Sequence, residues 1–454
     1  MRYKSDVKNS AAAADAGAGA GAAATCRTRA AAAAKAACAM ALALAMTLGF
    51  APNAAQATVY QSDIAGTVTL GSNSVISEGA PSLEATHGAL MASDGKILWR
   101  RDADTQVPMA STTKIMSALV ALENGSLGDT VTISENADSQ EGSTAELTAG
   151  DTVTLENLIY GMMLPSGNDA AMAVAEHFGS GNSQAFVDMM NAKAQELGMA
   201  NTHYTSPNGL VDEGNYTTAD DYLKLVSAAM ANSEFRTVVA QPTYTYTSLG
   251  NKLTVKLEST NELLGSYDGA NGVKTGFTDA AGYCLVASAE RNGEELYAVV
   301  FGSSTKNSRF TDAEALLDWG FEHYHTVTLA TAGEKVGEGV ATAWLDKTVG
   351  VAPAQDATAL LFDYDPDLEQ TVNIEDRDGR IEAGDKMGTM TWSRGDEEVA
   401  SVDLVATETV EAPNILESVQ IWWCRFASVF TGDSVSVEQK VEVGSTFPLI
   451  GATR

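Results

Sequence analysis

The sequence predicts a mixed α/β domain of the α+β type, followed by a small all-β domain. In residues 81–325, helical patterns lie between strand-like segments, and hairpin-linked strands close the region. From residue 326 to about residue 410, helical patterns largely disappear and short strand-like runs take over. A chain of 454 residues is long enough for two or three domains, each with its own hydrophobic core.

The chain is strongly acidic, although its first segment is basic. Its 28 lysines and arginines oppose 59 aspartates and glutamates, which gives a formal net charge of -31. Residues 1–57 hold six basic and two acidic residues, so the remaining 397 residues hold 22 basic and 57 acidic ones, a net charge of -35. This charge repels polyanions, and we expect no nucleic-acid partner.

Residues 1–57 have the pattern of a signal peptide. A basic, alanine-rich stretch precedes an apolar run from Ala36 to Phe50, and Ala55-Gln56-Ala57 forms a small-residue cleavage pattern. The run is shorter than the ~20 residues of a transmembrane helix. We therefore expect an exported, extracytoplasmic protein of the cell envelope that begins near Thr58, after which residues 58–80 form a linker. A disordered N-terminus or an uncleaved anchor is the alternative.

The elements of residues 81–325 follow from turn signals and hydrophobic periodicity. Residues 88–100 predict a hairpin around Ser93-Asp94-Gly95. Apolar residues at helical spacing predict a buried helix over 113–123, which places Ser111 at its start. Further helices are predicted over 155–163, 168–178, 183–197, 218–230 and 311–320, and strands within 241–260, 282–289 and 295–302.

Residues 326–410 predict a β-rich domain, and residues 411–454 an amphipathic helix with a tail. The candidate strands are 336–340, 357–362, 388–392 and 398–406. Within 414–430, apolar residues share one helical face: Ile415, Val419, Trp422, Trp423, Phe426 and Phe430. Two interpretations stay open for this helix, which are peripheral contact with a membrane surface and packing on the β domain.

Cysteine and histidine spacing predicts neither a metal nor a cofactor. Cys26 and Cys38 lie in the predicted signal peptide, which leaves Cys284 and Cys424 as one disulfide or as two buried thiols. The sequence has no C-x-x-C and no H-E-x-x-H. Residues 376–379 have part of a calcium-loop spacing but lack further ligands, and we interpret them as a turn.

Three short motifs together indicate serine chemistry that uses a lysine base. They are Ser111-Thr-Thr-Lys114 at the start of the buried helix, Ser166-Gly-Asn168 at a turn into a helix, and Lys274-Thr275-Gly276 in a strand pattern. Each motif alone is weak, because serines cap helices and glycines form turns. Their joint occurrence in this order predicts a catalytic site. None of the five histidines lies in a recognisable catalytic signature.

Each motif contains the residue types that the chemistry requires. Residues i and i+3 share a helix face, so Lys114 can reach Ser111. A lysine can act as a base when burial or a nearby cation, such as Lys274, lowers its pKa. A serine at 166 can relay a proton, and an asparagine at 168 can orient Lys114 and the substrate. We predict that Lys274 and Thr275 bind a substrate carboxylate and that Gly276 lets the substrate backbone lie against the strand. The backbone N–H groups of Ser111 and Phe277 are predicted to form an oxyanion hole.

Residues 85–326 resemble the exported D-alanyl-D-alanine carboxypeptidases, the low-molecular-mass penicillin-binding proteins, and the next 85 or so residues resemble their β-rich C-terminal domain. The similar segments are Pro108-Met-Ala-Ser-Thr-Thr-Lys114, Leu164-Pro-Ser-Gly-Asn-Asp-Ala170, Glu196-Leu-Gly-Met-Ala-Asn-Thr-His203, Pro207-Asn-Gly-Leu210 and Gly272-Val-Lys-Thr-Gly-Phe-Thr278. The resemblance implies a β-lactamase/transpeptidase-like fold, with an antiparallel sheet flanked by helices.

The resemblance also implies an activity and roles for individual residues. Ser111 is acylated by a peptidoglycan stem peptide or by a β-lactam inhibitor, Lys114 is the general base, Ser166 and Asn168 complete the site, and Lys274 binds substrate. Arg309 lies where the family often has an arginine for the terminal carboxylate. Phe277 stands where some members have His or Tyr.

Three other functions stay open at this level. A class A β-lactamase shares two of the motifs but needs a glutamate for deacylation, and S-G-N in place of S-D-N together with the β domain favours the carboxypeptidase. A non-catalytic wall-binding protein would keep the fold without the chemistry, which the intact motif set argues against. A crosslink-cleaving endopeptidase attacks a similar bond.

Overall fold

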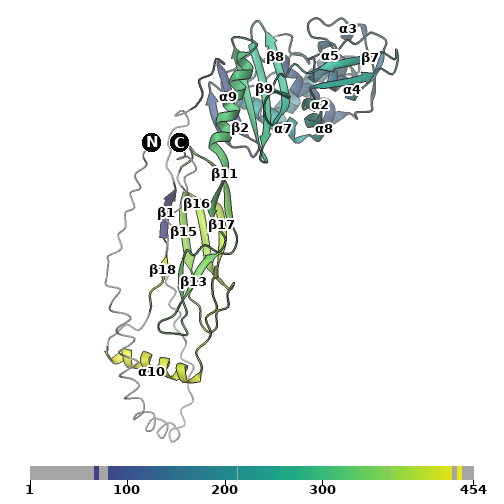
Figure 1. Ribbon diagram of the computed structural model, residues 1–454. Helices are drawn as coiled ribbons and strands as arrows, with labels where there is room; N and C mark the ends of the chain where they lie inside the picture. The colour runs from purple at the N-terminus through teal and green to yellow at the C-terminus, as the bar shows by residue number, and fades with distance from the viewer. Residues whose placement is uncertain (1–65, 71–79, 212, 367, 432–436, 442–454) are drawn as a thin grey trace. The chain divides into compact units, whose positions relative to one another are not determined.

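The computed structural model describes residues 66–70, 80–211, 213–366, 368–431 and 437–441 (Figure 1). These residues form two compact units, and each is described by itself below. One unit holds residues 80–325 together with Leu361–Tyr364, and the other holds 66–70, Thr326–Leu360 and the described residues from Asp365 onward. The division falls at Thr326, where the sequence predicts a change of domain. The predicted signal peptide lies outside the described residues.

An antiparallel five-stranded sheet in the order β3-β2-β10-β9-β8 forms the centre of the first unit. The side chains of each strand alternate between its two faces. One face packs against α9, and the other against a cluster of helices that includes α7 (Figure 1). The strands are β2 (His87–Ala92), β3 (Ile97–Arg101), β8 (Ala270–Thr278), β9 (Gly282–Arg291) and β10 (Glu294–Ser303).

The helices of this unit confirm the predicted periodicity. Helix α2 (Lys114–Asn124) is buried from Lys114 to Leu122, and a 3-10 turn, η1 (Ala110–Thr113), precedes it. The other helices are α3 (Glu135–Asp138), α4 (Leu155–Met163), α5 (Asn168–Phe178), α6 (Ser183–Glu196), α7 (Ala219–Ala231), α8 (Ser233–Val239) and α9 (Ser308–His323). Two small sheets pair β4 (Thr130–Thr132) with β5 (Thr152–Thr154) and β6 (Thr243–Thr247) with β7 (Thr254–Glu258).

The second unit contains an antiparallel sheet in the order β1-β15-β16-β17-β13-β12-β18. Strand β1 (Gly66–Leu70) lies inside the segment that the sequence predicts as a linker, and it pairs with β15. The remaining strands are β12 (Gly337–Val340), β13 (Thr348–Pro353), β15 (Leu368–Ile374), β16 (Lys386–Arg394), β17 (Glu397–Ala406) and β18 (Lys440–Val441), and β11 (Tyr324–Ala330) pairs separately with β14 (Ala357–Phe362).

Helix α10 (Ile415–Thr431) follows this sheet and has the predicted amphipathic face. Among the residues of α10, Cys424 alone is buried, whereas Trp422 and Phe430 are 61% and 75% exposed. No helix in the described part of the chain is long and apolar enough to cross a membrane. Cys284 and Cys424 are buried thiols in different units.

Candidate active site

Ser111 and Lys114 lie where η1 passes into α2, as their spacing predicts. Ser111 is in the 3-10 turn, and Lys114 is the first residue of the α-helix. Lys114 is fully buried, because α2 passes through the helical core on the α7 side of the sheet. Its side chain therefore reaches Ser111 from inside the protein, without contact with bulk water.

The amine of Lys114 has three neighbours at hydrogen-bond distance. Its Nζ lies 2.8 Å from Ser111 Oγ, 2.7 Å from Asn168 Oδ1 and 2.9 Å from the backbone oxygen of Asn208. The Asn168 and Asn208 oxygens can only accept hydrogen bonds. A neutral amine donates its two hydrogens to these oxygens, so its lone pair is directed at the hydroxyl of Ser111.

Burial and neighbouring cations favour this neutral form. Burial lowers the pKa of Lys114 well below its usual value, the charge of Lys274 lowers it further, and the Asp169 carboxylate opposes them more weakly. Burial and then Arg309 lower the pKa of Lys274 to about 7. A lysine can act as a base near neutral pH only under such conditions.

The Ser166-Gly167-Asn168 turn connects α4 to α5. Ser166 is buried and has a φ of 68°, in the left-handed region, so the turn departs sharply from the preceding helix. Asn168 opens α5, and its Nδ2 donates to Glu141 O at 2.7 Å, which fixes the side chain with its oxygen toward Lys114. The next residue, Asp169, accepts backbone N–H groups from Ala145 and Leu147 and thereby ties the turn to a neighbouring loop.

Strand β8 presents the third motif at the edge of the sheet. Lys274 and Thr275 are buried, and Lys274 Nζ donates to Thr275 O at 3.1 Å. Gly276 packs directly against η1: a Cβ atom at this position would lie 3.1 Å from Met109 O and 3.2 Å from Ser111 N. The glycine therefore allows β8 to approach Ser111 closely.

Arg309, at the start of α9, lies behind the same strand. Its Nη1 donates to Gly276 O at 3.1 Å, and its guanidinium lies over the rings of Tyr283 and Phe310. Its buried Nε has no hydrogen-bond partner among the described residues. Phe277 is 48% exposed and packs on Tyr283, with 4.4 Å between ring centroids.

The structure thus brings the predicted residues of all three motifs to one place, and Arg309 joins them through Gly276. The contact that the sequence does not reveal is the Asn208 carbonyl on Lys114. It belongs to the Pro207-Asn-Gly-Leu210 segment, where Gly209 has a φ of 74° and a Cβ would lie 2.0 Å from Ala110 O. The signal for it was the Asn-Gly pair, whose glycine permits this close approach.

Comparison with known proteins agrees with this arrangement. The family model of D-alanyl-D-alanine carboxypeptidases (peptidase S11) matches residues 74–305, and the model of the penicillin-binding protein 5 C-terminal domain matches residues 324–412. The D-alanyl-D-alanine carboxypeptidase of Streptomyces sp. K15 is 40% identical over 269 residues, covering 56% of this chain and 92% of the relative. The D-alanyl-D-alanine carboxypeptidase DacF of Bacillus subtilis is 33% identical over 340 residues, covering 72% and 86%.

Solved structures give the same result. The Streptomyces K15 DD-transpeptidase aligns with a TM-score of 0.52 at 39% identity, covering 54% of this chain and 99% of that structure. The D-alanyl-D-alanine carboxypeptidase DacD of Francisella tularensis aligns with a TM-score of 0.55 at 30% identity, covering 76% and 98%. The chain therefore belongs to the D-alanyl-D-alanine carboxypeptidases, the low-molecular-mass penicillin-binding proteins, and is a serine-type peptidase with the C-terminal β domain of that family.

Proposed function

We propose that the protein is exported and removes the terminal D-alanine of peptidoglycan stem peptides through an acyl-enzyme on Ser111. The observation that carries this proposal is the contact of 2.8 Å between Lys114 Nζ and Ser111 Oγ, made by a lysine whose pKa is strongly lowered. A base that is neutral and already aligned can take the serine proton as the hydroxyl attacks.

In the acylation step, Ser111 Oγ attacks the carbonyl of the penultimate D-alanine while its proton passes to Lys114. The N–H groups of Ser111 and Phe277 stabilise the oxyanion, and one such donor contributes about 3 kcal/mol to transition-state stabilisation. Gly276 supports this assignment, because its packing on η1 brings β8 beside Ser111 N. Ser166 relays a proton to the leaving amine, and Asn168 holds the base and the substrate backbone.

Cationic and hydroxyl groups select a substrate that ends in a carboxylate. Lys274 and Thr275 bind this carboxylate, and Arg309 adds positive charge from behind β8. In a chain that is otherwise strongly acidic, these residues form a local cationic site. Water then hydrolyses the acyl-enzyme, and a penicillin, whose amide is opened by the same attack, leaves a stable adduct on Ser111.

The decisive experiment incubates the purified protein with a pentapeptide that ends in D-Ala-D-Ala and measures free D-alanine. We expect release by the wild type and none by Ser111→Ala, while Ser401→Ala, an exposed serine of β17, retains activity. Undiminished release by Ser111→Ala would contradict the nucleophile assignment. N-terminal sequencing of protein recovered outside the cytoplasm tests export, and we expect a start near Thr58.

Treatment with benzylpenicillin separates the alternatives. Mass spectrometry locates the adduct and times its loss: slow release from Ser111 supports the carboxypeptidase, rapid turnover supports a β-lactamase, and no labelling supports a non-catalytic wall-binding protein. A crosslinked stem-peptide dimer offered beside the pentapeptide tests the endopeptidase.

A second candidate activity is transfer of the acyl group to an amine, because a structure that is 39% identical over 99% of its length is named a DD-transpeptidase. The acyl-enzyme is the same in both reactions, and only the nucleophile of the second step differs. Adding glycine to the pentapeptide assay tests this candidate: a new peptide ending in glycine supports transfer, and D-alanine release with hydrolysed product alone supports the carboxypeptidase.

We also propose that α10 contacts a membrane surface through its apolar face. Ile415, Trp422 and Phe430 are 84%, 61% and 75% exposed, whereas packing on the β domain would cover such side chains. The strong acidity of the chain argues against electrostatic attachment to anionic lipid, so the aromatic residues must supply the affinity.

Sedimentation with phosphatidylcholine vesicles tests the role of α10. We expect the wild type to sediment, the double variant Trp422→Ala with Phe426→Ala to stay in solution, and Gln420→Ala, an exposed polar position of the same helix, to behave as wild type. Equal binding by the double variant and the wild type would contradict the proposal.

A further inference from the structure

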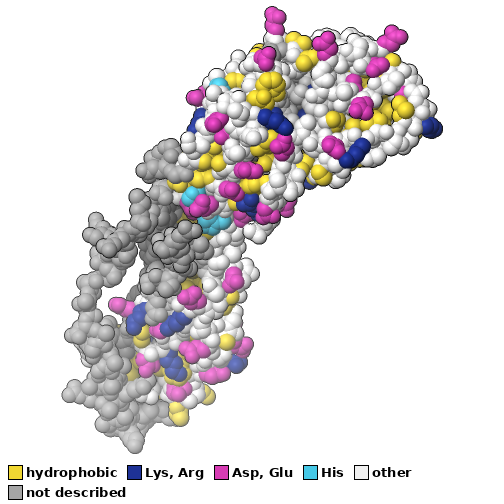
Figure 2. Space-filling model, turned by 45° about the horizontal axis from the view of Figure 1, so that its top comes forward, with side chains coloured by type: hydrophobic (Ala, Val, Ile, Leu, Met, Phe, Trp, Pro, Cys, Tyr) yellow, Lys and Arg dark blue, Asp and Glu magenta, His cyan; other side chains and the backbone are white. Residues whose placement is uncertain are grey.

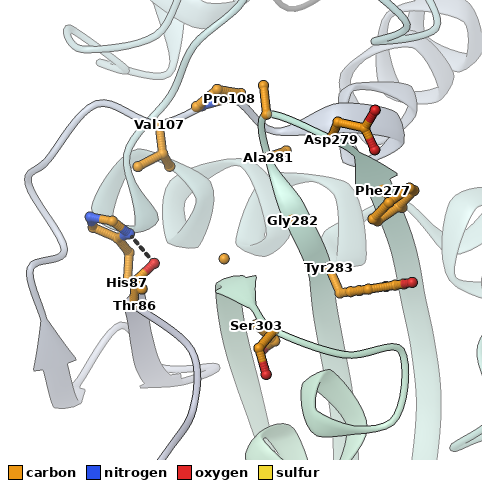
Figure 3. A pocket seen from close by; sticks show the side chains of 13 residues that line it. Thr86, His87, Val107, Pro108, Phe277, Asp279, Ala281, Gly282, Tyr283 and Ser303 are labelled. Carbon is orange, nitrogen blue, oxygen red and sulfur yellow. Dashed lines mark hydrogen bonds between the residues drawn. The ribbon is translucent and has the colours of Figure 1, made fainter.

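Beyond Gly276, the end of β8 borders a pocket of about 470 Å³ (Figure 3). Its wall includes Phe277 from β8, Asp279 from the turn that follows β8, Tyr283 from β9 and His87 from β2. The volume lies within the range of about 300–1,000 Å³ that is usual for ligand pockets. Neither Ser111 nor Lys114 lines it, so it lies beside the catalytic centre rather than inside it.

Most of the polar groups around this pocket already have partners. Thr86 Oγ1 bonds to His87 Nδ1 at 2.8 Å, and Ser303 Oγ donates to a carboxylate of α9 at 3.2 Å. Ser304 Oγ donates to Glu84 at 2.6 Å. These three hydroxyls therefore offer little to a ligand, and the charged group in this wall of the pocket is the carboxylate that follows β8.

The carboxylate of Asp279 is that group. It is exposed and forms no hydrogen bond or ion pair with the residues that the structure describes. Figure 3 shows its side chain next to that of Phe277 at the end of β8, on the same side of the β8–β9 hairpin. An exposed aromatic ring beside an uncompensated negative charge suits an aliphatic chain that ends in an ammonium group.

The register along β8 indicates which part of a stem peptide reaches Asp279, given the proposed function. With its carboxylate at Thr275 and its scissile carbonyl at the N–H of Phe277, the substrate runs antiparallel to β8, with its upstream residues toward Asp279. Strand β8 ends at Thr278, three residues or ~10 Å beyond Thr275 at ~3.3 Å per residue, and Asp279 is the first residue of the turn that follows. The third residue of the stem lies two positions upstream of the terminal D-alanine, ~7 Å, and a lysine-like side chain reaches up to ~6 Å further. Its amine can therefore reach the end of β8, where Asp279 lies.

We propose that Phe277 and Asp279 form a subsite for the free amino group on the side chain of the third stem-peptide residue. The ring of Phe277 contacts the methylene groups, and the carboxylate of Asp279 pairs with the ammonium. Acylation of that amine, as in a crosslink, removes the positive charge and lengthens the side chain. The enzyme therefore prefers stem peptides that are not crosslinked through this amine.

Two matched peptides test the subsite: Nα-acetyl-L-Lys-D-Ala-D-Ala with a free ε-amine, and the same peptide with the ε-amine acetylated. For the wild type, we expect kcat/KM to be about two- to fivefold higher for the free amine, because an exposed ion pair contributes little more than this. The ratio should fall as salt is added. In Asp279→Asn, we expect a ratio near one, and in Asp279→Lys the preference should reverse toward a peptide whose ε-amine is succinylated.

The control variant is Glu398→Gln, which removes the same charge from an exposed position of β17 in the other unit. This variant should keep the wild-type ratio of kcat/KM values for the two peptides. If Glu398→Gln also loses the preference for the free amine, the effect is one of net charge in general, and the subsite is overturned. A wild-type ratio in Asp279→Asn would also overturn it. Thermal melting checks that each variant is folded. If the wild type releases D-alanine from neither peptide, the proposed function is wrong. If it releases D-alanine from both peptides with equal kcat/KM, only the proposed subsite is wrong.

Discussion

The two units of the protein depart from ordinary burial in opposite ways. The catalytic unit buries the basic side chains of Lys114, Lys274 and Arg309, which are at most 5% exposed. In the described part of the C-terminal unit, the buried polar side chains are two neutral glutamines, but α10 exposes a row of large apolar residues. Charged groups are rarely buried, and contiguous apolar surfaces are rarely left in water.

This difference shows which feature lowers the free energy of unfolding in each unit. Burying a lysine disfavours folding, but it produces the neutral amine that the acylation step needs. Exposing the face of α10 disfavours the free protein in water, but it leaves that face available to a membrane surface. The comparison predicts that replacing a buried lysine of the catalytic unit raises stability and lowers activity. Replacing a buried residue of the C-terminal unit should lower stability and leave activity unchanged.

The largest effect is expected for Lys114→Met. Acylation by benzylpenicillin should slow by about 10²- to 10⁴-fold, because the proposed general base is lost. The melting temperature should rise, because a buried amine is replaced by an apolar side chain of similar length, which removes the cost of burying the polar group. Stopped-flow acylation and calorimetry measure the two quantities. Lys256→Met, at an exposed position of β7, is the control and should change neither. A lower melting temperature for Lys114→Met would break the comparison.

Two tryptophans of the C-terminal unit should give the converse result. Trp392 is fully buried, and Trp392→Ala should lower the free energy of unfolding by about 3–5 kcal/mol without slowing acylation. Trp422 is 61% exposed, and Trp422→Ala should change that free energy by no more than about 0.5 kcal/mol. Urea denaturation measures both. Equal losses in the two variants would show that α10 is packed in solution.

Gly276→Ala probes the contact between β8 and η1. A methyl group would meet Met109 O and Ser111 N at 3.1 and 3.2 Å, so the strand or the turn must shift. Crowding of this kind costs about 1–3 kcal/mol. We expect slower acylation as well, because the shift moves the backbone N–H of the nucleophile. Gly293→Ala, in the β9–β10 turn, has no atom near the added methyl, but its φ of 85° makes it a control for backbone strain alone. Wild-type acylation in Gly276→Ala would contradict the close approach.

The smallest predicted effect is a pH dependence from Lys274. Its pKa is about 7 in the folded protein, below its usual value of 10.5. Between these values, the unfolded chain binds more protons than the folded one, so the free energy of unfolding rises with pH by at most about 1.4 kcal/mol per unit. Denaturation at pH 7, 8 and 9 measures the slope, which should be smaller in Lys274→Met. An unchanged slope would show that Lys274 is charged when folded.

Much of the fold could be predicted because its helices are strongly periodic. The bounds of α4 and α5 agree with the predicted ranges, because a threonine cap and a glycine-containing turn mark where they begin. Strands β13 and β15 were missed. Gly350 and Pro353 weaken the pattern of the first, and Gln370 takes a buried position of the second. Gln370 is accommodated there because its Oε1 accepts a hydrogen bond from Trp392 Nε1, a partner that no local pattern reveals.

The candidate site divides in the same way. Motif spacing predicted that Lys114 reaches Ser111, and the structure places them in contact, because helix geometry brings i and i+3 together. For the Asn208 carbonyl, the Asn-Gly pair signals only a close approach of the backbone, and packing decides which carbonyl group contacts Lys114. The Asp279 carboxylate was also missed, because its relation to a substrate depends on the register along β8.

The position of β8 at the end of the sheet has a consequence for self-association. An edge strand leaves backbone N–H and C=O groups unpaired, and a second copy of the chain can pair with them as readily as a peptide can. Natural edges resist this with inward-pointing charges, and Lys274 is such a charge. We therefore expect Lys274, which we propose binds the substrate carboxylate, also to protect the edge from aggregation, and its replacement by an apolar residue should make the protein less soluble.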